Sequence, residues 1–154
     1  MMMMNALPEA DAGTRDGVLA WMARFAAAVR AVDYRAATPM WHDQVLAFGT
    51  HQAVLEGFAQ FRDRQWDSVW PRTADFTFVQ DAARVLASAD ASLAIAIAPF
   101  TSTGFHADGT PFPRPGRATL VLMRAAQGWI AVHSHLSLER GVPTESHGDR
   151  PVIR

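Results

Sequence analysis

The 154-residue chain lacks cysteine and lysine altogether, and it contains a single tyrosine. Without cysteine it has no disulfide, no thiolate nucleophile and no cysteine ligand for zinc or an iron–sulfur cluster. Without lysine it has no residue for Schiff-base chemistry or for the lysine of a phosphate-binding loop. We expect neither a cofactor nor a metal.

Strong charge and long apolar runs are also missing. The formal net charge is -1, which argues against a broad cationic surface for nucleic acid. No apolar run approaches the ~20 residues that a membrane-spanning helix needs. The opening Met1–Asn5 lacks the cationic and apolar segments of a secretory signal. These absences predict a cytoplasmic protein without a nucleic-acid or membrane partner.

Composition along the chain indicates one domain between two polar ends. Residues 1–13 read as a flexible leader, 14–140 as a single domain, and 141–154 as a polar tail rich in glycine and proline. The length suits one domain, and apolar residues make up 49% of the chain, so a buried core is expected.

Hydrophobic spacing predicts helices first and strands afterwards. Val18, Met22, Phe25 and Val29 fall at helical spacing behind Thr14, the expected N-cap. Further helices are predicted at 33–41 and 51–69, and strands at 45–49, 75–80, 83–88, 92–103, 117–125 and 129–138. The order predicts an α+β fold, a cone-shaped curved antiparallel sheet with N-terminal helices packed over its concave face. Such an arrangement leaves a cavity between helices and sheet.

The closing strands carry a recognisable motif. Trp129-x-x-Val132-His133-x-His135-x-Ser137 follows a turn at Gly128, and Gly116-Arg117 opens the preceding strand. Over about residues 15–140 the chain resembles the nuclear-transport-factor-2-like superfamily, in particular SnoaL-like proteins and the association (hub) domain of calcium/calmodulin-dependent protein kinase II. The resemblance implies a cone-shaped α+β barrel with a pocket, and a homodimer formed through the outer face of the sheet.

A related family supplies an informative mismatch. Residues 22–50 resemble the opening of the ketosteroid isomerases, whose oxyanion-hole tyrosine falls on Phe25 and whose general-base aspartate falls on Gly49. Neither residue can do that work, because a phenyl ring donates no hydrogen bond and glycine takes no proton. Between residues 84 and 138 the only acids are Asp90 and Asp108, both predicted in turns. The strands predicted in this range therefore offer no counterpart of the catalytic carboxylates of SnoaL-type cyclases or of limonene-epoxide-hydrolase-like members.

His133 and His135 are the candidate catalytic residues. They are two apart on a strand, so regular alternation puts both on one face with Ala131. In one interpretation that face lines the cavity, where a histidine binds ligand or accepts a proton. In the other they are structural or interface histidines. With His42, His51 or His106 they do not form a recognised metal motif.

Arg117 is the candidate anion-binding residue, since arginine offers carboxylates a planar fork. In the kinase hub domains the arginine at this motif position lies in the pocket, and the resemblance extends that role to Arg117. The other candidate ligand-binding residues are those whose segments converge on the cone, namely Phe25, Trp41, Phe48, His51 and Trp66. Tyr34, beside the helix cap Asp33, is expected near the surface.

These residues support three hypotheses. The first is a homodimer that binds a small anionic or polar organic ligand in a cone-shaped pocket. The second is an isomerase, cyclase or dehydratase that uses His133 or His135 as a general base. The third is a non-catalytic oligomerisation domain.

Overall fold

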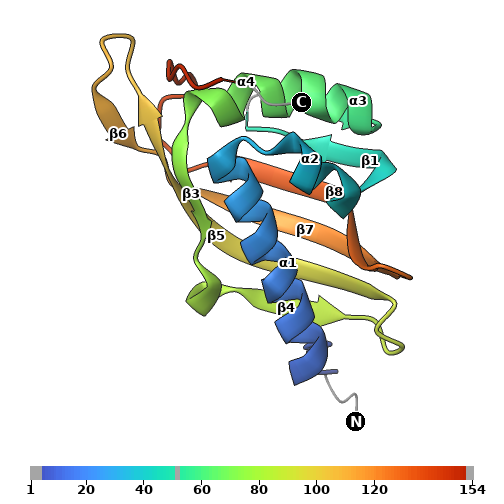
Figure 1. Ribbon diagram of the computed structural model, residues 1–154. Coiled ribbons are helices and arrows are strands. Elements are labelled where there is room, and N and C mark those ends of the chain that lie inside the picture. The colour runs from blue at the N-terminus through green and yellow to red at the C-terminus, as the bar shows by residue number, and fades with distance from the viewer. Residues whose placement is uncertain (1–4, 51–52, 152–154) are drawn as a thin grey trace.

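The computed structural model describes residues 5–50 and 53–151. Within these residues the chain forms four α-helical segments and eight strands (Figure 1). The helices are α1 (Ala12–Ala31), α2 (Tyr34–Ala37), α3 (Phe58–Phe61) and α4 (Asp67–Val69), with a π-helical turn (Arg62–Trp66) joining the last two. The strands are β1 (Trp41–Phe48), β2 (Val54–Glu56), β3 (Ala74–Phe78), β4 (Arg84–Ala87), β5 (Leu93–Phe105), β6 (Pro111–Pro113), β7 (Gly116–Ala125) and β8 (Gly128–Leu138).

The strands form one curved, unclosed sheet, and the α+β prediction is confirmed. The order is β2-β1-β8-β7-β5-β3, while β4 and β6 also pair with β5. Neighbouring strands run antiparallel except β1 and β8, which are parallel. Figure 1 shows α1 lying across one face of the sheet, with α3 and α4 above its end. We call the face under the helices concave and the opposite face convex.

Helix α1 follows from its sequence. Val18, Met22, Phe25 and Val29 are all buried, as their spacing predicts. The cap differs from the expectation, because Asp11 rather than Thr14 is the N-cap and its Oδ1 accepts from the Thr14 N–H at 2.7 Å. An aspartate cap leaves the Thr14 side chain free to be buried.

The third predicted helix, at 51–69, is wrong near its start. Residues 54–56 form strand β2 and pair with the end of β1, which needs an edge partner. Gly57 has a φ of 84°, a conformation that favours glycine, and the helix begins directly after it. Pairing across the sheet therefore overrides the helical spacing of Val54 and Leu55.

A β-bulge in β8 determines where its side chains point. Val121 of β7 pairs with His133, but Leu122 pairs with Ala131, so β8 carries one extra residue at Val132. The regular alternation predicted for this strand is therefore wrong. Ala131 and Ser134 are buried on the concave side, each 0% exposed. His133 and His135 lie on the convex face.

Both ends of the described chain pack against the domain. Near the start, Glu9 bridges to Leu86 of β4. Near the end, the N–H of His147 donates to the Phe105 carbonyl at 2.9 Å. Within residues 5–50 and 53–151, no helix has both the length and the apolar character needed to cross a bilayer.

Candidate functional site

A cavity of about 40 Å³ lies between the concave face and the helices. Its walls are mainly aromatic. Phe25 of α1 lies near the centre, with its ring centroid 5.1 Å from that of Trp41 and 5.7 Å from that of Trp70. Trp66 stacks on Trp70 at 4.3 Å. The other aromatic residues of the lining are Phe48, Phe61, Phe76 and Phe100.

Four predicted ligand-binding residues border this cavity: Phe25, Trp41, Phe48 and Trp66. Phe48 belongs to it only in part, because it is 38% exposed and its ring lies 5.0 Å from that of His135 on the convex face. That these residues bind a ligand stays a prediction. His51, the fifth, lies outside the described residues.

The three candidate polar residues do not line the cavity. The bulge turns His133 and His135 to the convex face, where His133 Nδ1 lies 2.7 Å from the Leu46 carbonyl, which accepts a hydrogen bond from it. Arg117 is exposed and pairs with Ser137 on the same face, because its neighbour Ala118 takes the buried position. The expectation that these side chains form the polar centre of the pocket is corrected accordingly.

Arg114 is the cation of the cavity, and our sequence interpretation missed it. It lies between two prolines ahead of β7 and is only 3% exposed. Its N–H donates to the Ser102 carbonyl at 2.8 Å, and the Ser102 hydroxyl donates to its carbonyl at 2.7 Å. These two bonds hold its backbone against β5, so the side chain points inward.

The Arg114 guanidinium is poorly satisfied. One of its N–H groups donates to Thr50 Oγ1 at 3.3 Å, while Nε has no hydrogen-bond partner within the described part of the chain. In the described part of the chain no carboxylate forms an ion pair with Arg114. Burial lowers its pKa to about 10, because desolvation disfavours the charged form. The side chain still carries its charge at neutral pH.

Two further polar groups face the cavity without partners. With respect to the residues that the structure describes, Gln65, 7% exposed, has no hydrogen bond at Oε1, and Ser134 has none at Oγ. Gln65 also explains Gly49, because a Cβ on that glycine would lie 1.8 Å from Gln65 Oε1. The amide therefore fills the space beside the position where the isomerase comparison puts the base. Gln65 belongs to the π-helical turn, a feature frequent at functional sites.

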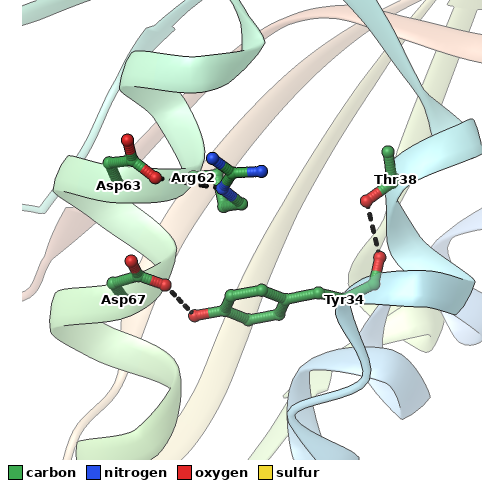
Figure 2. A network of polar contacts seen from close by, with 5 residues as sticks. All are labelled: Tyr34, Thr38, Arg62, Asp63 and Asp67. Carbon is green, nitrogen blue, oxygen red and sulfur yellow. Dashed lines mark hydrogen bonds and ion pairs between the residues drawn. The ribbon is translucent and has the colours of Figure 1, made fainter. Parts of the chain in front are cut away.

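Tyr34 is buried, at 2% exposure, and not near the surface as predicted. Figure 2 shows its hydroxyl pointing to Asp67, to which it donates a 2.6 Å hydrogen bond. The Tyr34 ring packs edge-on against Trp66 and Trp70. This contact joins α2 to the helical segment that carries two cavity tryptophans. Arg62 and Asp63 form a separate exposed ion pair on that segment.

The cavity walls have little capacity for acid–base or metal chemistry. Among the described lining residues there is no carboxylate and no imidazole. Likewise, no group of three or more histidine, aspartate or glutamate side chains within residues 5–50 and 53–151 is placed to hold a metal ion. The arrangement can bind an anion against Arg114 and an apolar group among the aromatic rings.

The convex face is a second feature, and it is apolar. Of the seven large hydrophobic residues that are exposed in the described chain, six lie on this face. They alternate with buried residues along their strands. The six are Leu46, Phe48, Val54, Leu93, Ile97 and Met123. We refer to them as the convex patch.

Comparisons with known proteins agree with this architecture. A family model described as a SnoaL-like domain matches residues 18–140. No curated protein sequence matches the chain. A nuclear transport factor 2-like protein from Salmonella enterica has a similar structure, with a TM-score of 0.71 and 18% identity over 86% of this chain and 97% of that one.

Two further structures are similar. One is a putative calcium/calmodulin-dependent protein kinase II association domain from Xanthomonas campestris, with a TM-score of 0.71 and 16% identity over 91% of this chain and 100% of that one. The other is the hub of that kinase from S. rosetta, with a TM-score of 0.67 and 22% identity over 88% of this chain and 99% of that one. At such low sequence identities, these similarities show the fold alone.

Proposed function

The chain belongs to the SnoaL-like family of the nuclear-transport-factor-2-like superfamily, and we propose that it binds a small organic monoanion in its cavity. The ligand's anionic group pairs with Arg114 and its apolar part lies among the aromatic rings. The anionic character follows the hypothesis drawn from the sequence, with Arg114 in the role expected of Arg117.

The observation that carries this proposal is the charge of Arg114, which no carboxylate among residues 5–50 and 53–151 compensates. Buried charges in proteins are ordinarily paired, because an isolated one costs several kcal/mol. Arg114 is 3% exposed, and among the described residues its side chain has a single hydrogen bond, 3.3 Å to a threonine. A ligand carboxylate satisfies its remaining donors with the bidentate geometry that guanidinium favours. Among the described residues that line the aromatic cavity, Arg114 is the only cation, which favours a monoanion there.

The proposal does not include catalysis. The enzyme hypothesis needs His133 or His135 beside the bound ligand, and both side chains lie across the sheet from the cavity. The described lining offers only hydroxyl, amide and guanidinium groups, none of which is an effective base near neutral pH.

Calorimetric titration with 3-phenylpropionate tests this function, with the uncharged 3-phenylpropanamide as its matched neutral ligand. We expect the acid to bind and the amide to bind at least about tenfold more weakly. Arg114→Met should abolish that preference, whereas Arg117→Met, on the convex face, should leave it unchanged. Equal affinity for acid and amide, or a loss caused by Arg117→Met alone, contradicts the proposal.

A second function, self-association through the convex patch, is favoured by the exposure of that patch. A monomer rarely leaves several large apolar side chains exposed on one face without a functional reason. Two of the similar structures are described as kinase association or hub domains. A homodimer would bury the patch together with His133 and His135, the interface role left open for them by the sequence.

Sedimentation velocity at micromolar concentration tests this second function. We expect a dimer for the wild type and a monomer for Leu46→Asp, because Leu46 is 51% exposed within the patch. The matched control is Leu7→Asp, which introduces the same charge at a residue that is 62% exposed and lies outside the patch. A monomeric wild type, or a dimer that survives Leu46→Asp, contradicts this assignment.

A further inference from the structure

A second cavity of about 340 Å³ opens beside the aromatic one. The two share Val69, Thr73 and Arg114 in their linings, so Arg114 lies at their junction. The remaining lining of the outer cavity is polar and consists of Ser68, Arg72, Thr144, Glu145 and Ser146. We call this outer cavity the vestibule.

Three of those residues belong to the segment Thr144–Arg150, which we call the strap. It lies beyond residue 140, where the family match ends. Figure 1 shows the dark red segment at this end of the described chain lying beside α4. The strap is therefore a wall of the vestibule that the SnoaL-like domain by itself does not supply.

The strap is fastened at both ends. Ser146 Oγ donates to the Arg72 carbonyl and accepts from the Phe105 N–H at 2.9 Å. Arg150 donates from its backbone N–H to the Pro71 carbonyl at 2.9 Å and from its side chain to the Trp70 carbonyl at 2.8 Å. These contacts make the vestibule a built cavity and not a gap beside a loose end.

We propose that the strap completes the ligand site, and that the ligand is a carboxylate bearing an amide beside its anionic group, as in an N-acylated amino acid with an apolar side chain. This inference rests on the proposed function. The aromatic cavity, at about 40 Å³, is smaller than a phenyl ring needs, so an aromatic end enters it by moving the lining side chains apart, and no room is left there for other ligand atoms. Ligand atoms beyond the carboxylate on Arg114 must therefore enter the vestibule.

The chemistry of the vestibule selects the amide. The hydroxyls of Ser68, Thr73 and Ser146 already donate to backbone carbonyls. Besides Arg114, the charged side chains of the described vestibule lining are the Arg72 guanidinium, a donor, and the Glu145 carboxylate, an acceptor that lies 3.9 Å from His147 Nε2. An amide matches this pair, because its carbonyl accepts from the guanidinium while its N–H donates to the carboxylate.

Calorimetry with two probes tests this inference. N-acetyl-L-phenylalanine carries the amide, and 3-phenylpropionate lacks it. We expect the wild type to bind the amide-bearing probe at least about tenfold more tightly. Thr144→Trp fills the vestibule at an exposed position and should remove that advantage while changing the affinity for 3-phenylpropionate less than about threefold. Thr110→Trp, in the exposed turn before β6, is the control of equal size.

Glu145→Ala supplies an independent variant, because Glu145 is 84% exposed and its loss should leave the fold intact. It should weaken N-acetyl-L-phenylalanine binding and leave 3-phenylpropionate binding unchanged. Equal wild-type affinity for the two probes, or parallel losses of both in the strap variants, overturns the role of the strap while leaving the proposed function standing. Failure of both probes to bind the wild type overturns the proposed function and this inference with it.

Discussion

Replacing Arg114 by methionine should make the unliganded protein more stable while removing its anion site. A pKa lowered from 12.5 to about 10 corresponds to about 3 kcal/mol against burial of the charged form, at 1.36 kcal/mol per pKa unit. Methionine keeps an apolar stem of similar length and forfeits the 3.3 Å bond to Thr50, worth about 1 kcal/mol. The net expectation is a gain of about 2 kcal/mol in the free energy of unfolding.

Urea denaturation followed by circular dichroism at pH 7 measures this change. In a thermal melt, the midpoint of the variant should lie about 4–8 °C above that of the wild type, at about 2–4 °C per kcal/mol for a domain of this size. Because the folded pKa of Arg114 lies below its unfolded value, the penalty is fully present below about pH 10 and is relieved as the pH rises further. A variant less stable than the wild type refutes the reasoning, because Arg114 must then have a stabilising partner within the protein.

Three other substitutions test the surroundings of the site. Tyr34→Phe should cost about 1–3 kcal/mol of unfolding free energy in urea, because it removes the 2.6 Å bond to Asp67; an unchanged midpoint would contradict this. Gly49→Ala should cost about 1–3 kcal/mol through its clash with Gln65, and adding Gln65→Ala should recover part of that loss, whereas additive losses would refute the contact. Asp90→Ala should lower the thermal midpoint at pH 7, because hydrogen bonds from Ser92 and Ser88 hold the pKa of Asp90 at about 2. That stabilisation is present above pH 3.8 and is lost as the pH falls through 2, so the difference from the wild type should vanish there; a constant difference would exclude this cause.

Local patterns predicted most of the fold. The buried stripe of α1 needs only the spacing of its apolar residues, and β5 alternates over its length. The strand at 54–56 could not be predicted in the same way. Its conformation depends on pairing with β1, and no pattern within the segment itself reveals that pairing.

The alternation predicted for β8, the strand of His133 and His135, is wrong for a physical reason. One extra residue at Val132 reverses the direction of every later side chain relative to the start of the strand. A bulge arises from the fit between β7 and β8, and nothing in the spacing of His133 and His135 reveals it. The same bulge brings Ser134 into the cavity.

Arg114 could have been found from the sequence. Buried positions continue in steps of two from Phe112 through Arg114 to Ala118 and Leu120. That alternation assigns Arg114 to the concave face and Arg117 to the convex one. Our sequence interpretation instead followed the family motif at Arg117, and it treated the proline-rich segment ahead of it as a loop.

The most direct test of the account is a crystal structure with 3-(4-bromophenyl)propionate, whose bromine can be located by anomalous scattering. The account predicts bromine density enclosed by Phe25, Trp66 and Trp70, with the carboxylate paired to Arg114. Bromine density on the convex face, with the carboxylate at Arg117, would contradict it.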